Sequence, residues 1–386
     1  MIKQLRKLQE SPWVFVAWVF LAWKVWMMAF LYLGLIALPQ QKDFLGGGAK
    51  YLAEPYLWAW ANFDGEHYLS IAQRGYGELE QAFFPVYPYL VRWFAGVYWT
   101  DLKVLLLVGL VLLNGCFYLG LVWFYKLVRL DFKKEVAEWS VLALAVAPTS
   151  FFFGSVYTES LFLLLSVGAF WAARKRKWWL AGLLAGIASA TMVIGVVLFF
   201  ALLAEWWWQR KKENKGRWWE LAASAISLSG LVFYMRFLAG RWGDALYFLH
   251  AQPYFGAGRS IDKLVLLYQV FWRYAKMIST VDFGSVAYFT VRLELGAALL
   301  FLLLGLVSLL RQRWSYSIFV VLAYLMPTLT GTFLSLPRFV LALFPAFILL
   351  GEGMVKIKWL KWGYLVVSCI LAGATTALFV KGFWVG

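Results

Sequence analysis

The chain has 386 residues, of which 63% are hydrophobic and only 15% are charged, with a formal net charge of +16. Soluble globular proteins contain roughly 45–50% apolar residues, so this composition excludes soluble enzymes, secreted disulfide scaffolds and disordered regions. Apolar runs of about 17–25 residues recur without alternating with polar residues, which also excludes an outer-membrane barrel. We therefore expect an all-α polytopic integral membrane protein.

Ten apolar segments predict the membrane spans. In chain order they are 13–38, 104–125, 136–153, 156–173, 178–208, 218–239, 294–311, 314–333, 338–353 and 362–380. Six of the polar gaps are short and basic, and the positive-inside rule places them in the cytoplasm. These gaps are Lys3/Arg6/Lys7, Lys126 to Lys134, Arg174 to Lys177, Arg210 to Arg217, Arg311/Arg313 and Lys356 to Lys361.

The segment 178–208 carries a basic cluster at each end, so a single crossing places one cluster on the wrong side of the membrane. A break near Ala190 to Gly195 into two short helices returns both ends to the cytoplasm. This gives about eleven transmembrane helices with the N-terminus inside and the C-terminus outside. One long tilted helix is the alternative interpretation. A broken hairpin at membrane depth is buried in protein or lines a wet cavity, so it also marks a candidate site.

Two long loops are expected on the outer side, at residues 39–103 and 240–293. In the first loop acidic residues outnumber basic ones, which is the reverse of the inner gaps. Both loops carry apolar residues at helical spacing, which predicts helices along the membrane interface. No repeat or soluble tail is evident, so we expect residues 1–386 to form a single domain whose outer loops make the active-site face.

The densest polar segment of the first loop runs from Asn62 through Asp64, Glu66 and His67. A carboxylate at the membrane face suits a general base, because partial desolvation raises its basicity. An acidic loop that is only solvated is the plainer interpretation of Asp64. A metal site formed by Asp64, Glu66 and His67 is a further alternative, although their spacing is not that of a known helical zinc motif.

The segment Phe63 to Pro85 resembles the signature of the PIG-V mannosyltransferases, a branch of the GT-C glycosyltransferases. The residues in register are Asp64, His67, Ile71, Ala72, Gly75, Tyr76, Glu78 and Ala82 to Pro85. Similar segments follow in order as far as residue 347: Pro148 to Ser150, Tyr157 to Phe162, Gly243-Asp244 with Gln252, Leu336 to Phe339, and Phe344-Pro345. The resemblance therefore covers nearly the whole chain.

Two positions depart from the family pattern. Phe63 stands where the family usually has tryptophan, and Met192 follows Ala190-Thr191 where the resemblance implies arginine. If that arginine binds substrate phosphate in the family, this protein must use another cation or accept a different ligand.

The resemblance implies a GT-C-like fold and an inverting glycosyltransferase that uses no nucleotide. The implied donor is a polyprenyl-phosphate hexose, mannose by the family's usual preference, and the reaction takes place on the non-cytoplasmic face with Asp64 as base. A phosphate leaving group departs as a stable anion, so the chemistry needs a base and cations rather than an acid. Arg338 is the best candidate cation because a guanidinium binds phosphate oxygens in a bidentate manner; snorkelling to headgroups is its plainer interpretation.

The remaining candidate substrate-binding residues are Glu66, His67, Tyr76, Glu78, Glu159, Asp244, Gln252 and Arg259. Glu159 orders a loop or binds acceptor hydroxyls, His67 contacts the phosphate or orients Asp64, and Asp244, Gln252 and Arg259 line the sugar pocket. We expect no metal or other cofactor and no nucleic-acid partner. The expected partners are the lipid-linked donor, a glycan or glycolipid acceptor and the bilayer.

Two alternatives from other classes stay open. One is a lipid or solute transporter without catalysis, although transporters more often show internal repeats and midplane polar residues. The other is a metal-dependent transferase of lipid-linked sugars. The expected location is a prokaryotic plasma membrane with the active site facing outward, or the endoplasmic reticulum in a eukaryote.

Overall fold

The computed structural model describes residues 11–41, 49–96, 101–214, 216–255, 258–260 and 263–386, and these residues form helices and no strand. The predicted basic cluster Lys3/Arg6/Lys7 lies outside them. The α-helices are α2 (Pro12–Ala37), α3 (Ala49–Ala53), α4 (Pro55–Trp58), α5 (Asp64–Arg74), α6 (Val86–Ala95), α7 (Leu102–Val128), α8 (Lys134–Ala145), α9 (Glu159–Arg174), α10 (Trp178–Ser189), α11 (Val197–Lys212), α12 (Trp219–Ala225), α13 (Ser229–Trp242), α14 (Tyr247–His250), α15 (Leu267–Thr280), α16 (Val286–Arg311), α17 (Trp314–Thr328), α18 (Leu336–Phe339), α19 (Phe344–Lys356) and α20 (Lys358–Val380).

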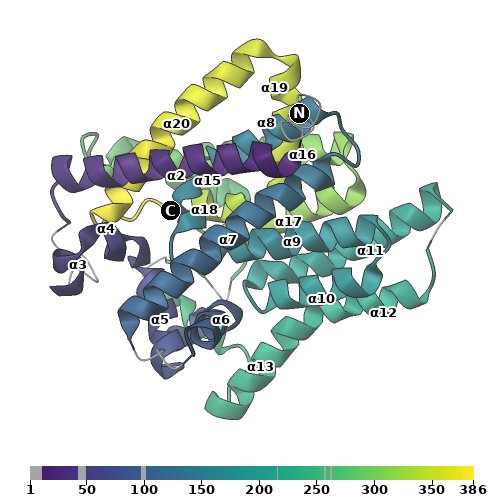
Figure 1. The fold of residues 1–386 in the computed structure, drawn as a ribbon, viewed down its shortest axis with the longest axis horizontal. Helices are drawn as coiled ribbons and strands as arrows, with labels where there is room; N and C mark the ends of the chain where they lie inside the picture. Colours follow the sequence, from purple (N-terminus) through teal and green to yellow (C-terminus); the bar gives the residue numbers. More distant parts are fainter. Residues whose placement is uncertain (1–10, 42–48, 97–100, 215, 256–257, 261–262) are drawn as a thin grey trace, which may run out of the picture.

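Short 3₁₀ turns connect several of these helices: η1 (Ala59–Ala61), η2 (Glu80–Ala82), η4 (Ser150–Gly154), η5 (Val193–Val196), η6 (Ile226–Leu228), η7 (Gln252–Phe255) and η8 (Val340–Ala342). The helices α7 and α9 run through the middle of the molecule, with α2 and α20 packed side by side above them in Figure 1. The helices α10 to α13 lie on the opposite side, and α5 and α6 pack beneath α7.

Six helical segments of the described chain are long and apolar enough to cross a membrane. They are Pro12–Ala37, Leu102–Val128, Val193–Lys212, Trp219–Trp242, Val286–Arg311 and Lys358–Val380. The protein is therefore an all-α integral membrane protein, as expected. The helices α8 and α9 have only 12 and 16 residues, so the count of eleven spans stays a prediction.

The predicted break near Ala190 to Gly195 is confirmed, which excludes one long helix over 178–208. The helix α10 ends at Ser189, the turn η5 follows, and α11 begins at Val197. Gly195 packs so closely on the end of α10 that a Cβ atom there would lie 2.6 Å from the carbonyl oxygen of Ala188. Only glycine fits where the chain turns back.

Four other predicted spans differ from the helices of the structure. The spans 136–153 and 156–173 are separated by a longer non-α segment, because Pro148 disfavours a helical conformation in the residue before it. The span 338–353 is bent by 83° between η8 and α19. The helix α16 begins at Val286 rather than 294, where Ser285 caps it by accepting a hydrogen bond from the Tyr288 amide at 3.1 Å.

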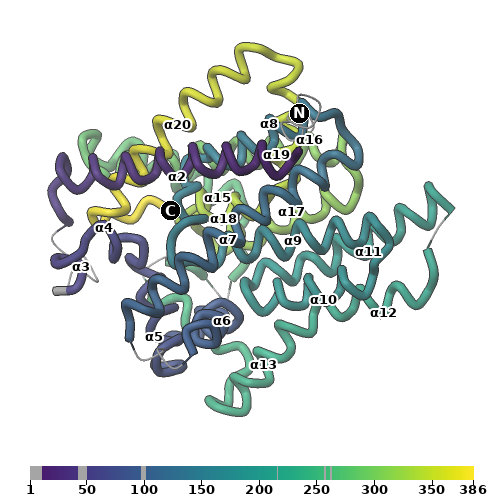
Figure 2. Tube along the Cα trace, viewed as in Figure 1, coloured from purple at the N-terminus to yellow at the C-terminus, as the bar shows by residue number. Residues whose placement is uncertain are grey.

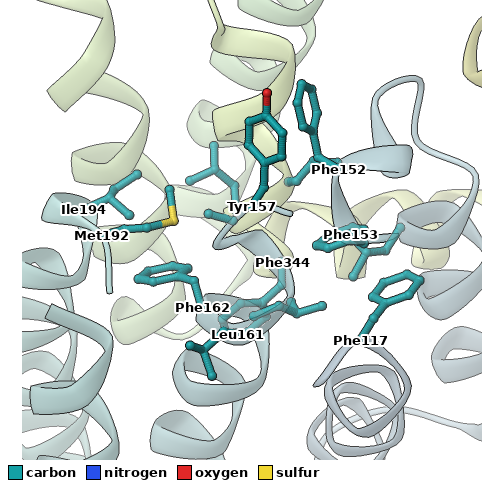
Figure 3. Packing of buried hydrophobic residues seen from close by; sticks show 14 of the residues in the cluster. Phe117, Phe152, Phe153, Tyr157, Leu161, Phe162, Met192, Ile194 and Phe344 are labelled. Atoms are coloured by element: carbon teal, nitrogen blue, oxygen red, sulfur yellow. The ribbon is translucent and has the colours of Figure 1, made fainter. Parts of the chain in front are cut away.

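The core is rich in aromatic side chains. Phe117 of α7 stacks on Phe153 of η4 with ring centroids 4.3 Å apart, and Phe152 contacts Tyr157 at 4.7 Å. Figure 3 shows these side chains in one packed layer with Phe162 and Met192. This layer supports the loop between α8 and α9, which forms part of the site described below.

Candidate active site

Asp64 is the first residue of α5, and the segment before it is held by two distant parts of the chain. The Val156 amide donates a hydrogen bond to the carbonyl of Trp60 at 2.8 Å, and the Tyr157 hydroxyl donates to the carbonyl of Asn62 at 2.8 Å. The Asn62 side chain donates to the carbonyl of Phe379, at the end of α20, at 2.9 Å. The segment directly before Asp64 is therefore anchored by hydrogen bonds to two distant parts of the chain.

Phe63 has a backbone conformation that non-glycine residues rarely adopt, with φ 59° and ψ −116°. Such a conformation costs of order 1–3 kcal/mol and persists only where the surrounding structure enforces it. The Phe63 ring packs on Trp384 at 5.0 Å and on Phe379 at 5.7 Å. These contacts hold the strained residue directly before Asp64.

Arg338 of α18 ion-pairs with two carboxylates from distant helices. Its Nη1 lies 2.5 Å from Asp64 Oδ2, and its Nε lies 2.9 Å from Glu159 Oε1. Ser335, just before α18, has φ 67°, so a residue with positive φ precedes each partner of the Asp64–Arg338 pair. We call Asp64, Arg338 and Glu159 the triad.

The three side chains of the triad differ in their exposure to solvent. The side chain of Glu159 is 2% exposed, that of Arg338 is 10% exposed and that of Asp64 is 23% exposed. Glu159 contributes charge rather than a well-aligned hydrogen bond, since neither of its oxygens has a hydrogen-bond partner among the described residues. Glu159 thus neutralises Arg338 from behind, while Asp64 faces the accessible side.

Aromatic rings surround the guanidinium of Arg338. The ring centroids of Phe152, Tyr157, Phe339 and Trp384 lie between 5.1 and 5.8 Å from its Cζ. Figure 2 shows that the C-terminal end of the chain lies near the middle of the molecule, close to α4 and α18. The arginine is buried rather than snorkelling, so the interpretation of Arg338 as a headgroup contact is wrong.

A second cation, Arg259, lies beside the triad. Its Nη1 donates to Gln252 Oε1 at 2.7 Å, and its Cζ lies 5.3 Å from the ring centroid of Phe339. Burial, and secondarily the neighbouring Arg338 cation, lower the pKa of Arg259 to about 10. Arg259 still carries its charge at neutral pH.

A comparison with known protein families covers part of this site. The family model described as Mannosyltransferase (PIG-V) matches residues 39–242, more than half of the chain and the part that contains Asp64 and Glu159. The chain belongs to the PIG-V mannosyltransferase family. The resemblance inferred from the sequence is thereby confirmed.

Two curated proteins are similar to part of this chain. They are "GPI alpha-1,6-mannosyltransferase 2" of Mus musculus and of Rattus norvegicus, 31% and 30% identical over 160 residues. Each match covers 39% of this chain and 32% of the relative. The match therefore spans about a third of the length of these relatives.

The fold is similar to that of solved GT-C glycosyltransferases. ArnT from Cupriavidus metallidurans, solved bound to undecaprenyl phosphate, aligns with a TM-score of 0.50 at 13% identity over 96% of this chain and 76% of ArnT. An oligosaccharyltransferase of Archaeoglobus fulgidus aligns with a TM-score of 0.47 at 14% identity over 93% of this chain and 53% of that one. At this identity the ArnT likeness shows a common fold.

Met192, where the family resemblance implies arginine, is buried among apolar side chains. It is 9% exposed and belongs to the same core cluster as Phe162 and Tyr157, as Figure 3 shows. This PIG-V chain therefore has no cation at position 192.

His67 of α5 faces a carboxylate that the sequence pattern does not single out. Its ring stacks on Phe83 at 4.6 Å and meets Phe255 of η7 at 5.6 Å. Its Nδ1 is 3.8 Å from Glu80 Oε1, and Glu80 is buried, with Oε2 accepting from the Gly77 amide at 2.6 Å. No spacing signal separates Glu80 from the exposed Glu78, because the positive φ of Leu79 turns Glu80 inward.

The other sequence-predicted residues have no contact with the triad. The Tyr76 hydroxyl donates to the carbonyl of Phe83 at 2.7 Å, while Glu66 and Glu78 are exposed. Asp244 pairs with His250 at 2.6 Å, and this hydrogen bond lowers the pKa of Asp244. Gln252 reaches the site through Arg259. Binding roles for Tyr76, Glu66, Glu78 and Asp244 stay predictions.

An apolar cavity of about 700 Å³ lies next to α18. Its walls come from α16, α20 and the segments around Thr149 and Pro337, and they include Tyr288, Leu300 and Leu371. Pro337 precedes Arg338, and its carbonyl accepts a hydrogen bond from the Thr149 hydroxyl at 2.6 Å. A residue of the cavity wall, Pro337, is therefore the sequence neighbour of Arg338 in the triad.

Proposed function

We propose that this protein is an inverting glycosyltransferase that moves a hexose, mannose by its family, from a polyprenyl-phosphate donor to a hydroxyl acceptor. Asp64 is the general base. The acceptor is a glycan or glycolipid. The observation that carries the proposal is the Asp64–Arg338 ion pair, in which a carboxylate and a guanidinium lie side by side; a guanidinium is well suited to bind phosphate oxygens.

The reaction balances with these groups. The acceptor oxygen attacks the anomeric carbon from the face opposite the phosphate, and its proton passes to Asp64. The bond between the anomeric carbon and the phosphate oxygen breaks, and its electron pair stays on the phosphate. The products are the inverted glycoside and polyprenyl phosphate.

Arg338 has two tasks in this scheme. Without donor it holds the Asp64 side chain in place through their ion pair. With donor bound, the phosphate competes for the guanidinium, and Asp64 is released to accept the proton. None of the described residues donates a hydrogen bond to Asp64 Oδ1, so that oxygen is available to the acceptor hydroxyl from the start.

The cavity next to Pro337 suits the lipid portion of the donor. Its lining is predominantly apolar, and burial of an isoprenoid chain there follows the hydrophobic effect. A donor whose phosphate reaches Arg338 can place its chain between α16 and α20. ArnT, which shares the fold, binds undecaprenyl phosphate in its crystal structure, and this is consistent with a lipid-phosphate donor here.

The ends of α9 support the proposed orientation in the membrane. Glu159 of the triad begins this helix, and Arg174 ends it, roughly 20 Å away. Arg174 pairs with Asp131 and with the buried Glu205. Arg174 and Asp131 both lie in basic gaps that the positive-inside rule assigns to the cytoplasm. The triad then lies toward the non-cytoplasmic face.

The test is sugar transfer by the purified protein in detergent. The donor is polyprenyl-phosphate mannose, and a lipid extract of the source membranes supplies the acceptor. We expect release of polyprenyl phosphate and a glycoside of opposite anomeric configuration, with no product from a nucleotide sugar. Transfer from a nucleotide sugar alone, or retention of configuration, contradicts the proposal. A transporter gives no product in detergent.

A further inference from the structure

Arg259 and Arg338 lie on the same aromatic ring. Their Cζ atoms are 5.3 and 5.2 Å from the ring centroid of Phe339. They come from parts of the chain that are far apart in sequence, the second outer loop and α18. The two guanidiniums repel each other, and an anion between or beside them offsets this repulsion.

The positive charge of Arg338 is already balanced by two carboxylates. Asp64 and Glu159 both pair with it, so the triad alone carries a net negative charge when both acids are ionised. A phosphate that approaches this group meets two carboxylates and one guanidinium. The phosphate needs a second cation to bind with favourable electrostatics.

Arg259 is that cation in the described part of the chain. No carboxylate oxygen of the described residues lies within 4.0 Å of its guanidinium nitrogens. Its partners are neutral: the Gln252 side chain at 2.7 Å and the carbonyl of Leu334 at 3.5 Å. Arg259 is half-buried. A cation partly withdrawn from water is normally paired with an acid, so the arrangement favours an anionic ligand.

We propose that Arg259 and Arg338 together form the phosphate site of the lipid donor, with Phe339 as their shared platform. This inference rests on the proposed function and adds a second phosphate-binding residue to it. The donor is a phosphodiester with one negative charge, and the phosphate gains a second charge when the bond to the anomeric carbon breaks. Arg259 stabilises this additional charge, because Arg338 is already balanced by its acids.

Gln252 is the positioning residue for this cation. Its Oε1 accepts from Arg259 Nη1, and its Nε2 faces the carbonyl of Phe248 at 3.5 Å. The contact to Leu334 orients the guanidinium from the other side, just before α18. The second outer loop thus supplies a phosphate ligand to a site whose base comes from the first.

Binding of farnesyl phosphate tests the proposal without requiring any sugar transfer. Farnesol is the neutral probe that reports only on the lipid chain. The variants are Arg259→Gln and Arg259→Lys, and the matched control is Arg241→Gln, which removes an exposed guanidinium 5.1 Å from the Trp242 ring. Thermal unfolding of each variant in the same detergent checks that it is folded.

We expect Arg259→Gln to weaken farnesyl phosphate binding about tenfold or more, since each hydrogen bond to a charged group is worth about one order of magnitude. Farnesol binding should not change, Arg259→Lys should restore part of the affinity, and Arg241→Gln should bind like the parent.

Three outcomes overturn the proposal, and they are distinguishable. If Arg259→Gln binds farnesyl phosphate like the parent while Arg338→Gln does not, Arg259 is no phosphate ligand and the proposed function stands. If Arg259→Gln weakens the binding of farnesol as much as the binding of farnesyl phosphate, the role of Arg259 is to shape the lipid site. If the parent itself does not bind farnesyl phosphate, the lipid-phosphate donor is wrong as well.

Discussion

Asp64 and Arg338 are 274 positions apart in the sequence and are joined by a 2.5 Å contact between Oδ2 and Nη1. Because Glu159 lies on the same guanidinium, two acids share one cation. The strength of each contact therefore depends on the other two side chains. This coupling makes the following substitutions informative.

Replacement of Glu159 by glutamine removes one of the two negative charges on Arg338. The remaining positive charge should bind phosphate several-fold more tightly, because the local potential becomes more positive. Asp64 should be held more firmly by Arg338, so turnover should fall. Equilibrium binding of farnesyl phosphate and the turnover number measure the two effects separately. Weaker phosphate binding would show that Glu159 only orders the loop.

Phe63 carries backbone strain at φ 59°, and two substitutions separate that strain from its ring packing. Phe63→Ala loses the contacts to Trp384 and Phe379 but keeps the strain. Phe63→Gly loses the same contacts and relieves the strain, so it should be more stable than the alanine variant by about 1 kcal/mol. Thermal unfolding in detergent measures the difference. An alanine variant as stable as the glycine variant would mean that the residue relaxes.

Chelation of divalent metal ions tests the alternative of a metal-dependent transferase. In the proposed phosphate site, the guanidiniums of Arg259 and Arg338 on the Phe339 ring would supply the positive charge that a metal ion supplies in other phosphate sites. Activity measured with excess EDTA should equal activity without it. A loss that returned when Mg²⁺ or Mn²⁺ was added back would reinstate the metal-dependent interpretation.

The close packing of α10 against α12 can be tested with one methyl group. A Cβ atom on Gly182 would lie 2.0 Å from the carbonyl oxygen of Ala223, so Gly182→Ala must separate the two helices. We expect destabilisation of about 1–3 kcal/mol. Gly115→Ala on α7 is the control, because a Cβ atom there meets nothing within 4 Å. Equal unfolding temperatures for the two variants would contradict the packing.

The features of the fold that depend on local sequence patterns could be predicted from the sequence. The basic clusters at both ends of 178–208 are enough to predict the break between α10 and α11, and helical spacing predicts the helices of the first outer loop. The early end of α8 and the bend before α19 could not be predicted, because the hydrophobic pattern of an apolar run is the same in a straight helix and in a bent one.

The candidate site is only partly predictable for a related reason. Asp64, Glu159 and Arg338 each stand out in the sequence, but nothing in their spacing shows that they meet on one guanidinium. The sequence predicts that Arg259 lines the sugar pocket, which stays a prediction, and it gives no sign of the contact between Arg259 and the ring of Phe339. Glu80 gives no sequence signal, since its burial depends on the backbone turn at Leu79. Such contacts arise from tertiary packing rather than from local sequence.

The role of Asp64 as the base is the central claim, and Asp64→Asn tests it most directly. Asparagine keeps the size of the side chain but cannot accept the acceptor proton. The control is Asp101→Asn, in which an acid that caps α7 through the Lys103 amide at 2.7 Å is neutralised away from the triad. Both variants are compared for turnover of polyprenyl-phosphate mannose and for binding of farnesyl phosphate. We predict that Asp64→Asn loses at least about 100-fold in turnover and still binds farnesyl phosphate, and that Asp101→Asn keeps its turnover; near-normal turnover by Asp64→Asn would contradict the account.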